Sequence, residues 1–260
     1  MIRKILSPLI ICLSINCFAQ KPHPEILNSV ADLETRTDLS EVTWAALYHA
    51  NLSEFPVGLF KCKNLEHISI SDGQILTVPE EIITALPKLN RIELEDCGLT
   101  EIPEVFYRLP GLKSLTLDGN KITIVTDRIN AMTKLEHFSL ANNQIQSIPA
   151  TINLPKLRSL DLKKNQLKEL PDAIYLSKSL DLIHLSNNPI AEISPKIGDL
   201  SKLEHLDLSF TQIKSLPATL KDCKKLKSIG IIETPLSSNS SERQKFESET
   251  GKKLISSYRL

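Results

Sequence analysis

The sequence predicts an α/β solenoid: a curved, right-handed superhelix with a parallel β-sheet on its concave side and irregular or short-helical segments on its convex side. The first reason is a repeated apolar pattern, LxxLxLxxNxL followed by an apolar-Pro pair, whose copies begin at Val42, Leu65, Leu89, Leu112, Leu135, Leu157, Leu180, Leu203 and Leu226. The second is that these starts are 22 to 24 residues apart. The third is the alternation within each copy, where apolar fourth and sixth positions indicate a short strand that buries one face.

The first segment, residues 1–19, has the composition of a signal peptide. A basic start precedes the apolar stretch Ile5–Ile15, and Ala19 lies just before the expected cleavage site. The apolar stretch is shorter than the ~20 residues that cross a bilayer. We expect export to the periplasm, the cell surface or the medium, and no transmembrane span. Lipidation at Cys17, and a cytoplasmic protein whose leader is not cleaved, are the alternatives.

Residues 20–41 and 237–260 are expected to cap the two ends of the repeat array. The N-terminal segment is amphipathic, with one apolar side made of Ile26, Leu27, Val30 and Leu33. In the C-terminal segment, Ser241 to Gln244 fits a capping box, and the polar helix that follows is expected to end at Gly251. A solenoid needs such caps because its last turns would otherwise expose the core.

Residues 42–236 form the predicted array of about nine turns. The pattern is cleanest in Leu112–Ile122 and Leu157–Leu167, and it resembles the leucine-rich-repeat family, in particular bacterial exported members with 23-residue LxxLxLxxNxLxxLP repeats. The resemblance implies a structural ladder in which asparagine amides bond the backbone of adjacent turns, here Asn120, Asn143, Asn165 and Asn188. The same column holds other residues at both ends, where we expect looser or shielded turns.

Composition excludes several other classes of protein. The 31 basic and 31 acidic residues give a net charge of +0, without the basic excess typical of nucleic-acid binders, and no GxxxxGK or GxGxxG motif occurs. Cys62 and Cys223 occupy an inward apolar position and Cys97 lies in the asparagine column, so buried thiols rather than disulfides are expected. We expect no cofactor and no enzymatic activity, since the array leaves no residues for a separate catalytic domain.

One cluster of polar residues raises a chemical alternative. Asp161, His184 and Asp207 fall at the same position of three successive strands, ~4.8 Å apart. A row of solvated cross-strand pairs is the favoured interpretation, with a zinc site or proton transfer as alternatives. His67, His137 and His205 share another position but lie three turns apart, ~14 Å, too far to bind one metal ion.

The outward strand positions are expected to form the binding surface. Turns two to four carry an acidic patch of Asp72, Glu93, Glu95, Asp96 and Asp118, which would attract a basic partner. The full set of expected contact residues is Asp72, Arg91, Glu93, Glu95, Asp96, Asp118, His137, Asp161, Lys163, His184, His205 and Asp207.

The predicted function is non-catalytic protein recognition by the concave face of a monomer. This inference rests on the resemblance, because that family is mostly used to bind proteins. A glycan-binding component of the cell envelope or of adhesion is the alternative partner class, and a cytosolic signalling scaffold is the alternative if the leader is retained. No nucleic-acid partner is expected.

Overall fold

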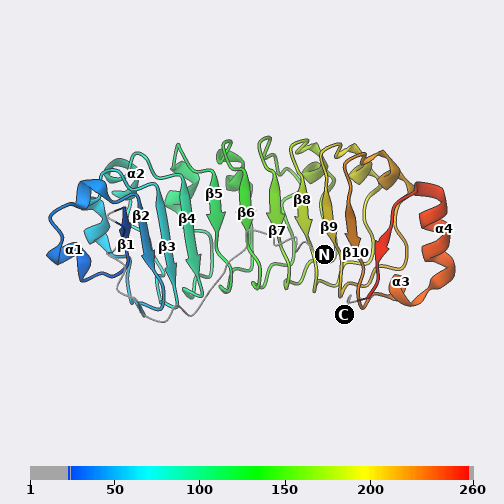
Figure 1. Cartoon of the computed structure of the whole chain (residues 1–260), viewed down its shortest axis with the longest axis horizontal. Helices are drawn as coiled ribbons and strands as arrows, with labels where there is room; N and C mark the ends of the chain where they lie inside the picture. Colours follow the sequence, from blue (N-terminus) through cyan, green and yellow to red (C-terminus); the bar gives the residue numbers. More distant parts are fainter. Residues whose placement is uncertain (1–22, 24, 258–260) are drawn as a thin grey trace, which may run out of the picture.

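The chain folds into one parallel sheet of eleven strands that follow one another in chain order (Figure 1). The computed structural model describes His23 and residues 25–257, so the predicted signal peptide lies outside the described residues. The strands are β1 Ile26–Leu27, β2 Trp44–Leu47, β3 His67–Ser71, β4 Arg91–Glu95, β5 Ser114–Thr116, β6 His137–Ser139, β7 Ser159–Asp161, β8 Leu182–His184, β9 His205–Asp207, β10 Ser228–Gly230 and β11 Leu254–Ile255. The predicted curved solenoid is confirmed.

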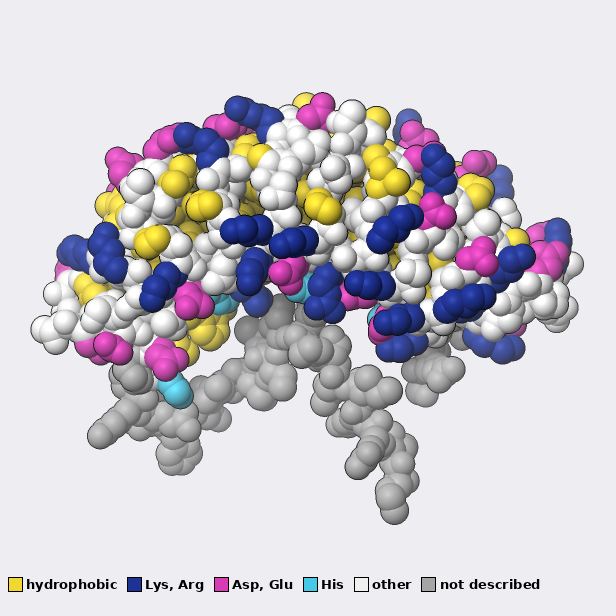
Figure 2. Space-filling model, turned by 90° about the horizontal axis from the view of Figure 1, so that it is seen from above, with side chains coloured by type: hydrophobic (Ala, Val, Ile, Leu, Met, Phe, Trp, Pro, Cys, Tyr) yellow, Lys and Arg dark blue, Asp and Glu magenta, His cyan; other side chains and the backbone are white. Residues whose placement is uncertain are grey.

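Short helical turns lie between the strands and stack on one another behind the sheet. They are α1 Asp32–Thr35, η1 Leu39–Glu41, η2 Val57–Lys61, α2 Ile82–Ala85, η3 Glu104–Arg108, η4 Asp127–Ala131, η5 Asp172–Leu176, η6 Pro195–Asp199, η7 Ala218–Asp222, α3 Pro235–Ser238 and α4 Ser240–Thr250. Helical turns need more room than neighbouring strands do, so the sheet lies on the inner side of an arch (Figure 2).

The core is one continuous layer between the sheet and the helical turns. In β7, Leu160 is buried and the next inward residue, Leu162, has no exposed surface, while Ser159 and Asp161 remain half-exposed. The other repeat strands keep the same inward positions, although the outward residues Ala46 of β2 and Ser69 of β3 are also buried. Each turn therefore buries its apolar residues against its two neighbours. No described helix is long and apolar enough to cross a membrane.

The central asparagines bond backbone groups of two successive turns. The Asn143 amide nitrogen donates to the carbonyls of Leu117 and Leu140, at 2.9 and 3.1 Å, and its Oδ1 accepts the backbone N–H of Ile122 at 3.0 Å. Thr211, in the same column, reaches only the carbonyl of Leu208 within its own turn, at 2.6 Å. The amide therefore joins turns that a hydroxyl does not.

The caps each add one strand to the sheet. β1 pairs with β2 at the N-terminal end and β11 with β10 at the other, so the sheet extends beyond the nine repeats. The capping box assigned to Ser241 and Gln244 is wrong. Helix α4 begins two residues earlier than that capping box implies, and the Asn239 side chain caps it by accepting the Glu242 N–H at 3.2 Å. The helix ends at Gly251, in the left-handed conformation (φ 68°) that glycine favours.

Candidate binding surface

The outward side chains form rows across the sheet because paired strands are aligned residue by residue. One row contains Trp44, His67, Arg91, Ser114, His137, Ser159, Leu182, His205 and Ser228. A second contains Ala46, Ser69, Glu93, Thr116, Ser139, Asp161, His184, Asp207 and Gly230. These rows lie on the concave side of the arch, and most of the predicted contact residues belong to them.

Glu93 is the best-anchored side chain of this surface. Its carboxylate accepts hydrogen bonds from Ser69 Oγ at 2.6 Å and Arg91 Nη2 at 2.5 Å, and it lies 3.3 Å from His67 Nε2. Burial alone would raise its pKa, but the hydrogen bonds from Ser69 and Arg91 and the close contact with His67 outweigh burial and lower the pKa to about 2. Glu93 is therefore charged at any physiological pH and is held in one geometry.

The His67 ring extends this cluster toward the N-terminal end of the sheet. It stacks on Trp44 with ring centroids 5.0 Å apart and planes 5° apart. Trp44 and His67 are both half-buried, so part of the stacked pair is exposed on the outward face of the sheet. A flat aromatic pair thus borders the anchored carboxylate of Glu93.

Glu95 has the opposite environment. It is half-buried, and no hydrogen bond or ion pair reaches its carboxylate from the part of the chain that the structure describes. Burial raises its pKa most, the negative charges of Asp118, Glu93 and Asp96 raise it further, and together they bring it to about 7. The surroundings of Glu95 therefore disfavour its negatively charged form.

Two of the other acidic residues of the patch, Asp72 and Asp118, accept hydrogen bonds from serine hydroxyl groups. Asp118 Oδ1 accepts Ser139 Oγ at 2.5 Å and the Ala141 N–H at 2.9 Å, although burial and the charge of Asp161 still raise its pKa. Asp72 and Asp96 lie just past their strands in the left-handed conformation, at φ 58° and 51°. Asp and Asn are the non-glycine residues that most often adopt this conformation.

The Asp161, His184 and Asp207 row does not close into a three-residue site. His184 Nδ1 lies 3.3 Å from Asp161 Oδ2, but Asp161 also binds Lys163, through its N–H at 3.0 Å and its ammonium at 3.1 Å. These hydrogen bonds outweigh burial and lower the Asp161 pKa. Asp207 instead accepts the N–H of Ser209 at 3.0 Å.

The remaining histidines of the expected set lie apart from one another. His205 Nδ1 bonds Ser228 Oγ at 2.7 Å, and the side chain of His137 is exposed. Across His23 and residues 25–257, no three His, Cys, Asp or Glu side chains are placed to hold a metal ion. The zinc alternative for the Asp161 row therefore gains no support from the geometry.

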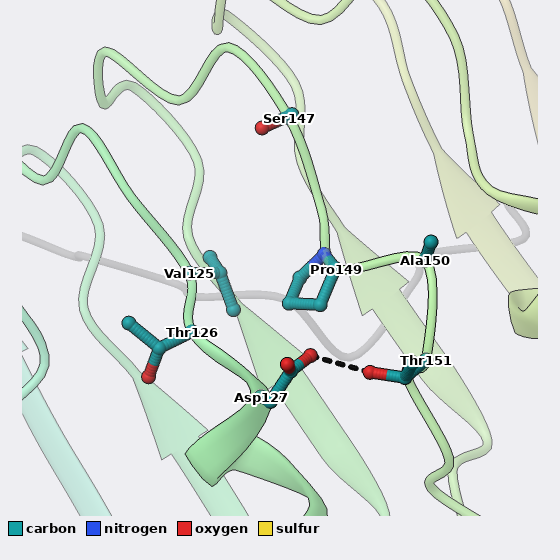
Figure 3. Close-up of a pocket in the computed structure, with 7 residues that line it drawn as sticks. All are labelled: Val125, Thr126, Asp127, Ser147, Pro149, Ala150 and Thr151. Carbon is teal, nitrogen blue, oxygen red and sulfur yellow. Dashed lines mark hydrogen bonds between the residues drawn. The ribbon is translucent and has the colours of Figure 1, made fainter.

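A shallow hollow lies elsewhere, beside η4 (Figure 3). It is lined by Val125, Thr126, Asp127, Ser147, Pro149, Ala150 and Thr151. Its one charged side chain, Asp127, already accepts a hydrogen bond from the Thr151 hydroxyl. An open hollow whose one carboxylate already has a hydrogen-bond partner has little to offer a ligand, so the strand rows remain the candidate surface.

Sequence reasoning missed two members of the surface, Ser69 and His67, as partners of Glu93. Both lie at outward positions of β3, next to β4. Aligning the repeats by position would have placed them beside Arg91 and Glu93. The alignment would not have shown that the Glu93 carboxylate binds its neighbours on the sheet surface while the Glu95 carboxylate has no partner among the described residues.

Family models match three parts of the array. A two-copy model described as "Leucine Rich repeats" matches residues 133–175 and 178–218, and a second, "Leucine rich repeat", matches residues 63–122. Among curated proteins, the chain is 27% identical over 131 residues to osteomodulin of Bos taurus, covering 50% of this chain and 30% of that protein. It is 31% identical over 104 residues to the leucine-rich repeat-containing G-protein coupled receptor 5 of Xenopus tropicalis, covering 39% and 11%.

Solved structures resemble more of the chain. A Leptospira interrogans LRR protein superposes with a TM-score of 0.77 at 25% identity, over 84% of this chain and 55% of that one. An internalin of Listeria monocytogenes superposes with a TM-score of 0.60 at 20% identity, over 80% and 58%, which shows the fold alone. The chain spans less than two thirds of each of these relatives, so their whole-protein activities do not transfer to it.

Proposed function

Because the chain is built from leucine-rich repeats, we propose that it is a non-catalytic recognition module that binds a basic segment of a partner protein on its concave face. Open, curved sheets present long surfaces with little enclosure, which suits extended macromolecular ligands. This part of the proposal is an analogy between folds, and the residues of the face supply the rest.

Glu95 is the observation that carries the proposal. A half-buried carboxylate without a partner, surrounded by Asp118, Glu93 and Asp96, costs stability when it is charged. A lysine or arginine from a partner would supply the missing counter-charge. Such a residue is stabilised either by protonation or by the positive charge of a basic ligand.

The neighbours of Glu95 suit this role because they are already fixed. Glu93 is held by three side chains and Asp118 by two donors, so binding would not need to order them. Preorganised acceptors lose little conformational entropy on association. The stacked Trp44–His67 pair offers an apolar border for the alkyl part of a basic side chain.

A protein partner fits the face better than a glycan does. Glycan-binding grooves usually present exposed aromatic rings along their length. The exposed aromatics among the described residues of this face are Tyr48 and Phe210, seven turns apart. The middle of the face holds charged and small polar side chains instead.

We place the protein outside the cytoplasm on the composition of residues 1–19, which lie outside the described residues. The N-terminal sequence of the protein isolated from its host tests this location. Cleavage after Ala19 supports export, and an intact leader would favour the cytosolic scaffold instead.

The binding proposal is tested by capture with a C-terminally tagged protein from the native host. The test variant combines Asp72→Asn, Glu95→Gln and Asp96→Asn, which removes three charges and keeps side-chain shape. The control combines Glu101→Gln, Glu169→Gln and Glu192→Gln, three exposed carboxylates that follow the asparagine column. A protein captured by the wild type and the control but lost by the test variant supports the proposal, and equal capture by all three contradicts it.

A further inference from the structure

One edge of the solenoid collects basic residues that the overall charge conceals. We define the lead-in edge as the four residues that precede each strand from β3 to β10. These segments hold eleven basic and four acidic residues, a net charge of +7, and every one of the eight contains a lysine. The basic residues are Lys63, Lys88, Lys113, Lys134, Lys156, Arg158, Lys178, Lys202, Lys224, Lys225 and Lys227.

The opposite edge of the same turns shows no such excess. The four residues that follow the asparagine column in these eight turns hold three basic and three acidic residues, a net charge of zero. The basic ones are Lys121, Lys168 and Lys214. The charge of the lead-in edge is therefore a property of one side of the molecule and not of the repeat as a whole.

Most of these lysines are not used to hold the fold together. Lys88, Lys113, Lys134, Lys156, Lys202 and Lys225 are exposed and form no ion pair within residues 25–257. Of the four acidic residues, Asp181 pairs with Arg158 at 2.8 Å and Glu204 pairs with Lys227. Glu66 and Glu136 are the remaining carboxylates. Like charges on adjacent turns repel one another, so folding alone gives no reason for the row.

The row is long and lies on a flat side of the arch. Adjacent strands are ~4.8 Å apart, so eight of them carry the row over roughly 34 Å. Figure 2 shows Lys and Arg side chains following the arc from end to end near its concave border. In Figure 1 the segments that enter the strands lie at nearly one level along the long axis. Many separate charges thus face outward in one plane.

We propose that the lead-in edge docks the protein on a planar anionic surface, the phosphate headgroups of a lipid bilayer. Lysines act as compact, hydrated point charges on flexible side chains, whereas arginines give bidentate recognition of single phosphates. The edge has no aromatic residue on which a nucleic-acid base could stack, and its leucines are buried. A protein docked on this edge keeps its concave face perpendicular to the bilayer and open to a partner.

The test measures binding of the full chain to vesicles of one part phosphatidylglycerol and two parts phosphatidylcholine, against vesicles of phosphatidylcholine alone. The edge variant combines Lys88→Gln, Lys113→Gln, Lys134→Gln and Lys156→Gln. The matched control combines Lys121→Gln, Lys164→Gln, Lys168→Gln and Lys214→Gln, four exposed lysines that lie past the strands, with the same loss of charge. Thermal melts of both variants establish that they are folded.

The wild type and the control should bind anionic vesicles, the edge variant should bind at least tenfold more weakly, and high salt should release all of them. Equal weakening in both variants would show that net charge matters and the edge does not. Failure of the wild type to bind anionic vesicles, including the case in which it binds the linear polyanion heparin instead, would also overturn the proposal. None of these outcomes depends on the partner of the concave face.

Discussion

Two glutamates separated by one residue on β4 have opposite chemical characters. Glu93 is held by His67, Ser69 and Arg91, and its pKa falls to about 2. Glu95 is buried among like charges, and its pKa rises to about 7. Glu93 therefore carries a negative charge at every physiological pH. A positively charged ligand would change the protonation of Glu95 more than that of Glu93.

The raised pKa of Glu95 predicts a loss of stability as pH rises. Between the ordinary value of 4.5 and the folded value of about 7, the folded state holds the proton more tightly than the unfolded state does. The free energy of unfolding therefore falls as pH rises through this window. With allowance for solvent screening, Glu95→Gln should be more stable than the wild type by about 1 kcal/mol near pH 8 and equally stable near pH 4. Urea unfolding at both pH values measures this, and a variant that is less stable near pH 8 would contradict the assignment.

The asparagine column predicts a second difference at the scale of single residues. Asn143→Ala leaves the Ile122 N–H and the Leu117 carbonyl buried without this partner, so it should cost about 1–3 kcal/mol of unfolding free energy. Thr211→Ala removes a hydroxyl that bonds only within its own turn and should cost less. Chemical denaturation of the two variants compares them. Equal losses would mean that the amide adds nothing by bridging turns.

Among the elements, the strands were the most predictable and the caps the least. Period-two alternation placed all nine repeat strands, because each must bury its apolar face in the same core. β1 and β11 have no repeat pattern, and they join the sheet because its edge strands leave backbone groups free to pair. The α4 start was misplaced because Ser241 and Gln244 fit a capping box in sequence, whereas Asn239 reaches the helix first.

This correction predicts which residue the C-terminal helix depends on. Asn239→Ala should destabilise α4 by about 1 kcal/mol, while Ser241→Ala should change little, since Ser241 lies inside the helix. Hydrogen exchange of the α4 amides reports the loss locally. Faster exchange in the Ser241 variant than in the Asn239 variant would support Ser241 as the N-cap and contradict the assignment of Asn239.

The helical turns show a second regularity, with a period of three repeats. Tyr107 of η3 bonds the side chain of Thr126, which replaces the usual proline of the next turn. Three turns later, Tyr175 of η5 precedes Ser194, which replaces that proline again. The segments Leu65–His67, Leu135–His137 and Leu203–His205 repeat as Leu-Glu-His with the same spacing. The sequence of the array therefore shows a three-turn periodicity at these positions.

At the scale of the whole molecule, the net charge of +0 is a poor guide to the surface. Apart from Lys224, Lys225 and Lys227, the lysines of the lead-in edge are separated by about one repeat in sequence, so most of the row is not visible as a basic stretch of the chain. Stacking the turns brings them together on one side and gathers the acidic patch on another. The sequence was enough to place the acidic patch, since three of its members lie within Glu93–Asp96, but not to show which of its charges are paired.

The measurement that tests the concave-face claim most directly is site-specific photo-crosslinking to the partner. A photoreactive phenylalanine analogue replaces Thr116, which lies in the outward row beside Glu93, or Thr123, an exposed residue beyond the asparagine column. The claim predicts a crosslink to the partner from position 116, none from position 123, and loss of the first when Glu95→Gln is added. A crosslink from position 123 with none from position 116 would mean that the partner binds elsewhere and would contradict the account.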